Sequence, residues 1–424
     1  MQTELFPSTA SFASTRQEAL IRLDEFVPLS GRYSRDRNRV VPGHPSVSRL
    51  SPAIRHRLLS VEECVEAVLR RYAPSTVEKF VQELYWRRYW KSWLSLRPQV
   101  WDDYLRDLAE LQEGSQHVSI RERISRIEAG ECDIAIMAHF SRELVNTGYL
   151  HNHARMWFAG WWIHVERLPW QLGADFFFRH LLDSDPASNT LSWRWVAGLQ
   201  TPGKTYLPRR GNLEKYVAAE ILSSNREGLE KMEHPTANLP PLPPRPEISR
   251  RSLPQQEVAK GQSTGVWLHE EDLCPESSPL ASLQPSALLV RGDASSWTTC
   301  RFPEWKQDWL RKALLDAESR ASGHFGCPAS PPSSLSLESN LASWAREKDL
   351  TQVLAMRPEV GPLADRINLI RDTLAAAGAK LVLLDHPGDL AVRSMATGGF
   401  FGFWKKVQRH ANSHRGAACD ETRA

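Results

Sequence analysis

The 424-residue sequence has few cysteines, no long apolar run and little net charge. Its six cysteines lie at positions 64, 132, 274, 300, 327 and 419. No two of them form a C-x-x-C pair, which argues against a zinc site, an iron–sulfur cluster and a disulfide framework, and fits a reducing compartment. No apolar run is long enough to span a membrane and the N-terminal segment has no signal-peptide core, so we expect a cytoplasmic protein that does not enter a membrane. A formal charge of +3 is too small to indicate nucleic-acid binding by itself, so any DNA site must be a local patch.

Prolines concentrate between residues 234 and 254, in the segment HPTANLPPLPPRPEISRRSLP. Such a segment cannot pack as a helix or a central strand, and it predicts an exposed linker. The chain before it, from Ser51 to about Tyr216, has the periodicity of consecutive helices. The chain after it alternates four short apolar segments with helical stretches, which predicts a parallel sheet; these segments are GVWLHEE, SALLVRG, LTQVLAM and KLVLLDH.

We therefore predict a multidomain protein with a helical and an α/β part. The predicted boundaries are a helical domain at 1–225, a proline-rich linker at 226–260, an α/β domain at 261–408 and a disordered tail at 409–424.

Several residues mark where helices should begin and end. Ser60 and Ser75 are each followed three residues later by glutamate, which predicts two capping boxes. Ser51 and Asp185 each precede a proline, which predicts an N-cap followed by proline in the first turn. Gly148 is expected to end a helix.

Residues 149–198 combine an unusual number of tryptophans with polar groups. The tryptophans lie at 157, 161, 162, 170, 193 and 195, with Trp101 upstream. The polar residues among them are Asn152, Arg155, Asp183, Asp185 and Asn189. Buried polar groups are costly unless something satisfies them. The segment therefore predicts a large aromatic cofactor with polar groups of its own.

The order of motifs in this segment is specific. HN-x-x-RM, LPW and LLD-x-D-x-x-x-N-x-x-x-W-x-W resemble the flavin-binding domain of the photolyase/cryptochrome family, and the resemblance covers residues 15–220. A weaker resemblance covers 264–408, where VWLHEEDLCPESSPL and GGFFGFWKK are similar to the first loop and the exit segment of the family's α/β antenna domain. That domain normally precedes the helical one, so the order here looks circularly permuted. The resemblance implies FAD, an all-helical flavin domain, a Rossmann-like α/β domain and a second antenna chromophore of unknown identity.

The segment Ser48-Arg49-Leu50-Ser51-Pro52 offers two hydroxyls, a guanidinium and a helix N-terminus. These groups suit a phosphate, although plain helix capping explains the same pattern. The resemblance assigns the segment to the flavin pyrophosphate, together with Tyr33. Val47 stands where threonine is commoner, which removes one hydroxyl.

In the predicted helix QELYWRRYWKSW, Glu83, Trp86, Arg87 and Trp90 share one face. An exposed ion pair beside core tryptophans would produce the same pattern. The resemblance implies instead that Arg87 reaches the flavin and that a DNA lesion is bound by Glu83, Trp86, Asn152, His153, Met156 and Trp195. His153 replaces an arginine that is common in the family, which leaves the affinity for DNA in question.

The resemblance also assigns roles to the acidic and amide residues. Arg155 is expected to pair with Asp183, a pair that could equally serve helix packing alone. Ser184 and Asp185 join the cofactor contacts with Asn152, and Asn189 is expected to face the reactive nitrogen N5 of the flavin. Asparagine at that position suits a reduced, protonated N5.

Trp193, Trp170 and a third indole are expected to relay electrons to the flavin after light absorption. The first two match the family positions, whereas for the third the sequence offers Trp101 only by its position upstream. Core packing is the alternative role for each of them. Ala138 replaces a usual aspartate, with no consequence that the sequence reveals.

The function implied is a deoxyribodipyrimidine photo-lyase: a monomeric, metal-free flavoprotein that binds damaged DNA and splits cyclobutane pyrimidine dimers by light-driven electron transfer. A (6-4) lesion is not excluded. The two alternatives are a cryptochrome-like blue-light receptor without repair activity and a flavin-less interaction scaffold.

Overall fold

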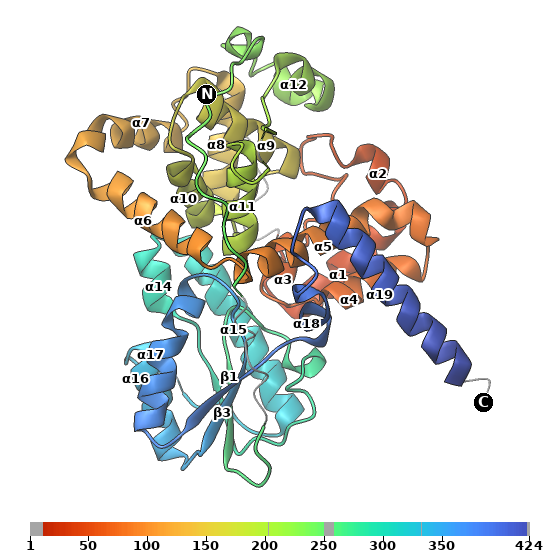
Figure 1. Ribbon diagram of the computed structural model, residues 1–424, viewed down its shortest axis with the longest axis vertical. Helices are drawn as coiled ribbons and strands as arrows, with labels where there is room; N and C mark the ends of the chain where they lie inside the picture. The colour runs from red at the N-terminus through yellow and green to blue at the C-terminus, as the bar shows by residue number, and fades with distance from the viewer. Residues whose placement is uncertain (1–11, 202, 250–257, 332, 422–424) are drawn as a thin grey trace.

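A computed structural model describes residues 12–201, 203–249, 258–331 and 333–421. Within these ranges the chain forms a helical part followed by a smaller α/β part, which confirms the predicted fold class (Figure 1). None of the described helices is long and apolar enough to cross a membrane.

The described residues before 233 form helices and no strand. The α-helices are α1 (Arg16–Ser30), α2 (Tyr33–Asp36), α3 (Ser51–Arg55), α4 (Val61–Leu69), α5 (Pro74–Ser95), α6 (Gln99–Glu113), α7 (Val118–Glu128), α8 (Ala135–Thr147), α9 (Asn152–Gly160), α10 (Trp170–His180), α11 (Pro186–Val196), α12 (Arg210–Tyr216) and α13 (Ala219–Leu222). Shorter turns follow at η2 (Ser115–His117), η3 (Trp161–Val165, a π-helix) and η4 (Leu229–Met232). Their shared core contains Trp157, Trp161, Trp162 and Trp193, all fully buried.

Most predicted helix ends are found. Ser60 forms the predicted capping box with Glu63, Gly148 ends α8 in the left-handed conformation, and Asp185 caps α11 through Ser188 N. Two predictions were wrong. Ser75 makes no capping box because α5 already begins at Pro74, and Ser51 is the first residue of α3 rather than its N-cap.

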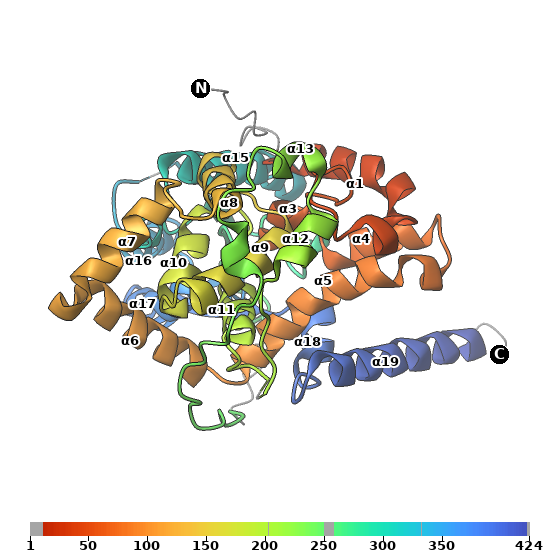
Figure 2. The ribbon, with the colours of Figure 1, turned by 90° about the horizontal axis from the view of Figure 1, so that it is seen from above.

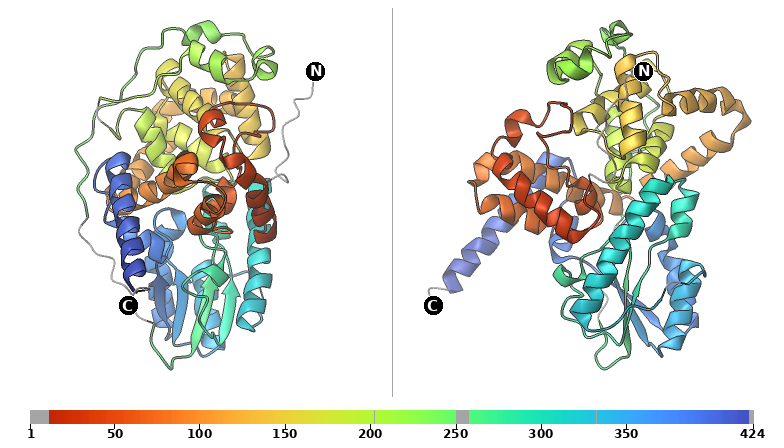
Figure 3. Two further views of the ribbon diagram at one scale, coloured as in Figure 1. Left: turned by 90° about the vertical axis from the view of Figure 1, so that its right-hand side faces the viewer. Right: turned by 180° about the vertical axis from the view of Figure 1, so that it is seen from behind.

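Residues 233–249 form no helix or strand and run along one side of the molecule between the two parts (Figure 3). Two backbone N–H groups of the segment donate hydrogen bonds to the helical part, Asn238 N to the His164 ring at Nδ1, 3.1 Å, and Ser249 N to Leu96 O, 2.7 Å. Its Leu239 and Leu242 side chains are exposed, as expected for a proline-rich connection without a core of its own. Residues 250–257 of the predicted linker lie outside the described residues.

The α/β part contains the four predicted strands in one parallel sheet of order β2-β1-β3-β4. The strands are β1 (Thr264–Leu268), β2 (Ala287–Val290), β3 (Gln352–Met356) and β4 (Lys380–Leu384). Its helices are η5 (Pro275–Ser277), α14 (Ala294–Thr299), α15 (Glu304–Phe325), α16 (Leu337–Glu347), α17 (Pro362–Ala376), α18 (Pro387–Arg393) and α19 (Phe400–Glu421). One sheet face packs on α16 and α17 and the other on α15, so the strands are apolar on both faces.

The C-terminal segment differs from the prediction. Residues 409–421, for which the sequence predicts disorder, continue α19, and residues 422–424 lie outside the described residues. The first turns of α19 pack against α5, and its far half extends beyond the body of the protein (Figure 2). The aromatic residues of GGFFGFW supply this packing, because Phe400 and Phe403 are fully buried.

A buried ionic junction joins the two parts. Residues 55–57, Arg-His-Arg, face residues 270–272, Glu-Glu-Asp, and Asp389. Arg55 donates two hydrogen bonds to the Glu271 carboxylate, at 2.6 and 2.5 Å. His56 Nδ1 lies 2.6 Å from Glu270 O, and Leu273 N donates to His56 O at 3.0 Å.

Arg57 adds a second set of contacts to this junction. Arg57 pairs with Asp272, at 3.3 Å, and with Asp389, which also accepts from Arg88 Nε at 2.9 Å. Arg57 has φ of +51°, a backbone conformation that costs energy in a non-glycine residue and that the two carboxylates hold in place.

The junction fixes the charges of its members. Burial by itself raises the pKa of Glu271, but the charge and hydrogen bonds of Arg55 outweigh burial and lower that pKa from 4.5 to about 2. Burial lowers the pKa of His56 to about 3, so this ring is neutral at neutral pH. A buried carboxylate that remains charged requires its partner, and loss of either partner leaves an unpaired buried charge.

We predict that Glu271→Ala lowers the free energy of unfolding by about 3–5 kcal/mol, because Arg55 loses its buried partner. Urea denaturation measures the change. Glu66→Ala is the matched control: Glu66 pairs with Arg70 on the surface at 2.7 Å, and its loss should cost less than about 1 kcal/mol.

Acid should weaken the junction in a defined window. The folded-state pKa of Glu271 is lowered, so its contribution is present above the ordinary value of 4.5 and is lost as pH falls toward about 2. The urea midpoint of the native protein should therefore fall through this range more steeply than that of Glu271→Ala. Parallel pH profiles of the two proteins would contradict the assignment.

Candidate functional site

Helix α5 carries the predicted residues Glu83, Trp86 and Arg87 on one face. It is 22 residues long and starts with proline in its first turn, where the missing N–H costs no hydrogen bond. Arg87 points toward the start of α11, where its Nη2 donates to Asp185 Oδ2 at 3.2 Å and to Arg55 O at 3.0 Å.

Arg155 and Asp183 form the predicted ion pair. Arg155 Nη2 donates to Asp183 Oδ2 at 2.9 Å, and its Nε donates to Leu150 O at 2.7 Å. Burial raises the pKa of Asp183, but the charge of Arg155 and hydrogen bonds from Arg155 and Ser51 hold it below its ordinary value. The carboxylate is therefore charged at neutral pH.

Asp185 combines a structural and an electrostatic role. Its Oδ1 caps α11 by accepting from Ser188 N at 2.8 Å. Burial acts to raise the pKa of Asp185, but Lys91, Arg87 and Arg55 together hold it well below its ordinary value. Sequence analysis missed Lys91, whose Nζ lies 3.5 Å from Asp185; its spacing of four residues from Arg87 is the signal that could have identified it.

Asn189 lies on α11, one turn after Asp185. Its Nδ2 donates to Ala174 O at 2.8 Å, which fixes the amide and leaves its carbonyl oxygen as the group it can offer to a donor. Ser184, between the two aspartates, is bound by Lys306 Nζ through its hydroxyl at 2.9 Å and by Arg55 Nε through its carbonyl at 3.3 Å. Ser184 thus connects this site with the junction.

The segment Ser48–Ser51 forms a tight turn and not the predicted helix N-cap. Ser48 Oγ accepts from Leu50 N at 3.3 Å, and Leu50 is fully buried. Arg49 has φ of +56°. The phosphate prediction rested partly on free N–H groups at a helix N-terminus. The helix concerned, α3, has only five residues and so attracts an anion weakly, which makes Arg49 the stronger anion ligand.

Tyr33 and Glu83 are brought together by Arg37, which the sequence analysis missed. Arg37 forms an ion pair with Glu83 and a side-chain hydrogen bond with Tyr33. Tyr33 also packs edge-on against Phe26 and Phe80. The predicted phosphate residue and the predicted lesion residue are therefore neighbours.

Trp86 has one face covered by the C-terminal helix. The rings of Trp86 and Phe400 stack with centroids 3.8 Å apart and planes 9° apart. Phe400 in turn contacts Tyr89 edge-on at 5.7 Å. This stack has the geometry that a nucleobase would adopt on an indole.

The remaining predicted lesion residues differ in exposure. Asn152 is exposed at the start of α9, and Met156 and Trp195 are half-buried. His153 requires a correction: it is buried, its Nδ1 lies 2.9 Å from Asn38 O, and its ring stacks on Trp157 at 4.1 Å. Burial lowers the pKa of His153, so the residue is neutral and turned inward and cannot face DNA.

Trp193 and Trp170 lie on the packed helices α11 and α10. A Cβ placed on Gly173 would lie 2.3 Å from Trp193 Cη2, so the absence of a side chain there lets the indole approach α10, one turn from Trp170. Trp193 contacts Trp162 edge-on at 6.1 Å, and Trp170 stacks on Tyr104 at 5.5 Å. Ala138 is buried on α8.

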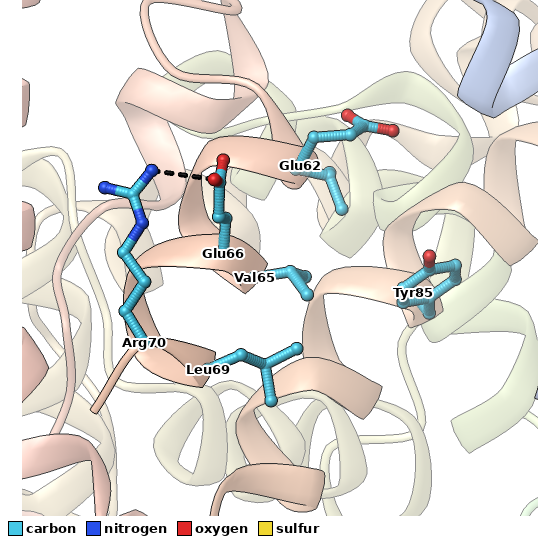
Figure 4. A pocket seen from close by; sticks show the side chains of 7 residues that line it. Glu62, Val65, Glu66, Leu69, Arg70 and Tyr85 are labelled. Carbon is cyan, nitrogen blue, oxygen red and sulfur yellow. Dashed lines mark hydrogen bonds and ion pairs between the residues drawn. The ribbon is translucent and has the colours of Figure 1, made fainter. Parts of the chain in front are cut away.

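A surface cavity of about 430 Å³ lies elsewhere, between α4 and α5 (Figure 4). Val65, Leu69 and Tyr85 line it, with the exposed Glu66–Arg70 pair at its edge. None of the predicted cofactor residues lines this cavity.

The predicted site retains unsatisfied polar atoms that suit a flavin nucleotide. Within the described ranges, Asp183 Oδ1 and Arg49 Nε are buried and have no hydrogen-bond partner. A buried carboxylate oxygen accepts from N–H or O–H groups such as those of a flavin ring or ribityl chain, and a partly exposed guanidinium attracts phosphate. The donor set therefore fits FAD.

Comparison with known proteins gives the same assignment. Residues 80–216 match the FAD binding domain of DNA photolyase. This part of the chain belongs to the photolyase/cryptochrome family.

The relatives of this photolyase-type domain include both branches of the family. The chain is similar to a deoxyribodipyrimidine photo-lyase of Alkalihalophilus pseudofirmus, 30% identical over 45% of this chain and 39% of the relative. It is also similar to a cryptochrome DASH of Idiomarina loihiensis, 29% identical over 44% of this chain and 41% of the relative. Among solved structures, a class III photolyase from Agrobacterium tumefaciens gives a TM-score of 0.42 at 24% identity, over 50% of this chain and 46% of that one. The chain thus spans about two fifths of the length of these curated relatives.

Phe400→Ala should expose Trp86 if the stack holds in solution. Hydroxyl-radical footprinting read by mass spectrometry should show Trp86 oxidised several-fold faster in this variant than in the native protein. Phe401→Ala is the matched control, because the neighbouring side chain is 66% exposed and does not cover Trp86. Equal oxidation of Trp86 in all three proteins would contradict the contact.

Proposed function

We propose that this protein is a deoxyribodipyrimidine photo-lyase that binds FAD and splits cyclobutane pyrimidine dimers in DNA under light. The buried Arg155–Asp183 pair with its unsatisfied Oδ1 carries the flavin part of the proposal. Bound FAD would supply light absorption and electron transfer. The family assignment and the photo-lyase relatives support the reaction as a proposal for this chain.

The residues of the chain would position the cofactor. Asp183 would accept from the flavin, and Arg49, with the Ser48 hydroxyl, would hold the pyrophosphate. Arg87 and Lys91 keep Asp185 charged beside them, which gives the site a fixed balance of charge before the cofactor binds. The Asn189 carbonyl oxygen would accept from a protonated flavin nitrogen, which favours the reduced cofactor.

Asp183→Ala should lose bound FAD. The substitution removes the acceptor and leaves Arg155 unpaired, and we expect the dissociation constant for FAD to rise at least tenfold, about 1.4 kcal/mol or more. Isothermal titration with FAD measures it. Asp102→Ala on the outer face of α6 is the control; a native affinity in Asp183→Ala would remove this site from the proposal.

DNA with a thymine dimer would enter beside Glu83, Trp86, Asn152, Met156 and Trp195. The lesion would be taken out of the duplex, at a cost that is smallest for a damaged pair. The face of Trp86 that Phe400 covers can stack on the lesion only if the start of α19 moves away from it.

The Phe400–Trp86 stack specifically favours a second candidate function. If α19 keeps this position, the flavin stays photoactive while the stacking face is closed to DNA, which describes a blue-light receptor without repair. Cryptochrome DASH among the relatives is consistent with this candidate.

Lesion binding and repair separate the two candidates. For a repair enzyme, Trp86→Ala should weaken binding of a thymine-dimer oligonucleotide by about 1–3 kcal/mol, and Phe400→Ala should strengthen it. Phe401→Ala controls for the loss of an aromatic ring from α19. If the reduced, FAD-loaded protein and Phe400→Ala both repair nothing under light while the flavin cycles normally, the receptor is the better assignment.

A further inference from the structure

The proline-rich segment LPPLPPRP, residues 239–246, takes no part in the predicted flavin site. Each of its residues is a proline or directly precedes one. Proline fixes φ at about −65°, and the residue before a proline is confined to extended conformations. The segment therefore favours a polyproline II helix, which is extended and makes no hydrogen bonds within itself.

The helical part holds this segment at both ends, along one side of the molecule (Figure 3). Upstream, the Asn238 side chain donates to Ile163 O at 3.0 Å. Downstream, Glu247 O accepts from the Gln99 side chain at 2.8 Å. Within the part of the chain that the structure describes, no hydrogen bond reaches residues 239–246. The segment is thus displayed with its ends fixed, which lowers the entropy that a partner must remove on binding.

The side chains of the segment are arranged by a period of three. A polyproline II helix has three residues per turn, so residues three apart lie on one edge. Leu239, Leu242 and Arg245 therefore share an edge, and Pro240 and Pro243 share the next. The two leucines are 55% and 62% exposed, and Arg245 is exposed as well. Prolines and polar residues suffice for a stiff spacer, whereas two exposed leucines in register with a cation form a pattern that a groove can recognise.

Arg245 keeps its charge available to a partner. No carboxylate among the described residues forms an ion pair with it. Burial lowers the pKa of Arg97, and the nearby positive charge of Arg245 adds to that effect. A carboxylate brought by another molecule would therefore be attracted to this end of the segment.

We propose that residues 239–246 are the docking site of a second protein, which binds them through a proline-recognition domain of the SH3 type. Such a domain binds a polyproline II segment in a groove lined by aromatic side chains. Each leucine, with the proline that follows it, would fill one slot between aromatic rings. Arg245 would pair with a carboxylate at the end of the groove. Pro241 and Pro244, on the third edge, would face solvent.

Docking requires the first leucine to leave a shallow contact with the helical part. A Cβ placed on Gly198 would lie 3.0 Å from Leu239 Cδ2, and Pro240 is half-buried. No hydrogen bond of the described residues opposes this movement, because the nearest bonds are made by Asn238. The pair Leu242–Pro243 is already exposed.

Isothermal titration of the full-length protein with an isolated SH3 domain tests the docking. The domain is selected, from SH3 domains with an acidic pocket beside the groove, by its binding to a synthetic peptide of residues 237–248. Leu242→Ala and Arg245→Ala should each weaken its binding to the protein by roughly tenfold or more, as expected for residues that anchor an interface. Arg226→Ala is the matched control, because it removes an exposed positive charge outside the segment.

Pro243→Ala and Pro244→Ala separate docking from stiffness. Both substitutions remove one proline and make the free segment more flexible to a similar extent. Only Pro243 lies on an edge that docks, so Pro243→Ala should weaken binding several-fold more than Pro244→Ala. Equal losses in the two variants would contradict the assigned edges.

The proposal is overturned if no such domain binds the peptide, or if the selected domain binds the peptide but not the folded protein. Equal affinity for the native protein and Arg245→Ala would also overturn it, because a groove that recognises prolines alone would then be the partner. The segment lies outside the predicted flavin site, so Asp183→Ala should bind the domain as the native protein does, whatever its affinity for FAD.

Discussion

The bidentate pair between Arg55 and Glu271 is the interaction on which the arrangement of this molecule depends. It lies between the two parts, is closed to water, and continues on the helical side to Ser184 and Asp185 through Arg55 and Lys91. A carboxylate of the α/β part therefore contributes to the field at the start of α11. Unpaired buried charges are strongly unfavourable. Any other docking of the two parts would leave several of these charged side chains without their partners. The contact between the two parts and the predicted cofactor site therefore share one network of charged groups.

The same junction gives the α/β part a role besides stability. The α/β part contributes Glu271 to the charged groups around Asp185, and its Asp365 accepts a hydrogen bond from Trp101. The segment that follows the α/β part contributes Phe400, which stacks on Trp86. Each contact reaches a different region of the helical part: the residues predicted to bind the cofactor, the end of α6 that carries Trp101, and the face of Trp86 that Phe400 covers. A change in how the α/β part docks would therefore alter the surroundings of all three regions at once.

Local signals in the sequence predicted much of the fold. Ser60, Gly148 and Asp185 mark helix ends because capping needs few neighbouring residues, and the four strands are short apolar segments. The Arg155–Asp183 pair was predicted through its motif rather than through physics. Contacts between distant residues left no such mark: nothing near Trp86 indicates Phe400, and nothing near Trp101 indicates Asp365. His153 was misplaced for the same reason, since its inward orientation depends on Asn38 and Trp157.

The order of the two parts along the chain determines when their contacts can form during synthesis. Glu271 follows Arg55 by 216 residues and Asp389 follows Arg57 by 332. At about 5–20 residues per second, the nascent chain waits about 10–40 s between Arg55 and its partner. During that interval Arg55 and Arg57 remain hydrated cations on the helical part, whereas Arg88 already has Glu62, 26 residues before it, as a partner. The contacts between the two parts therefore form only after the α/β part has been synthesised, and they bury these arginines against carboxylates that the chain adds late.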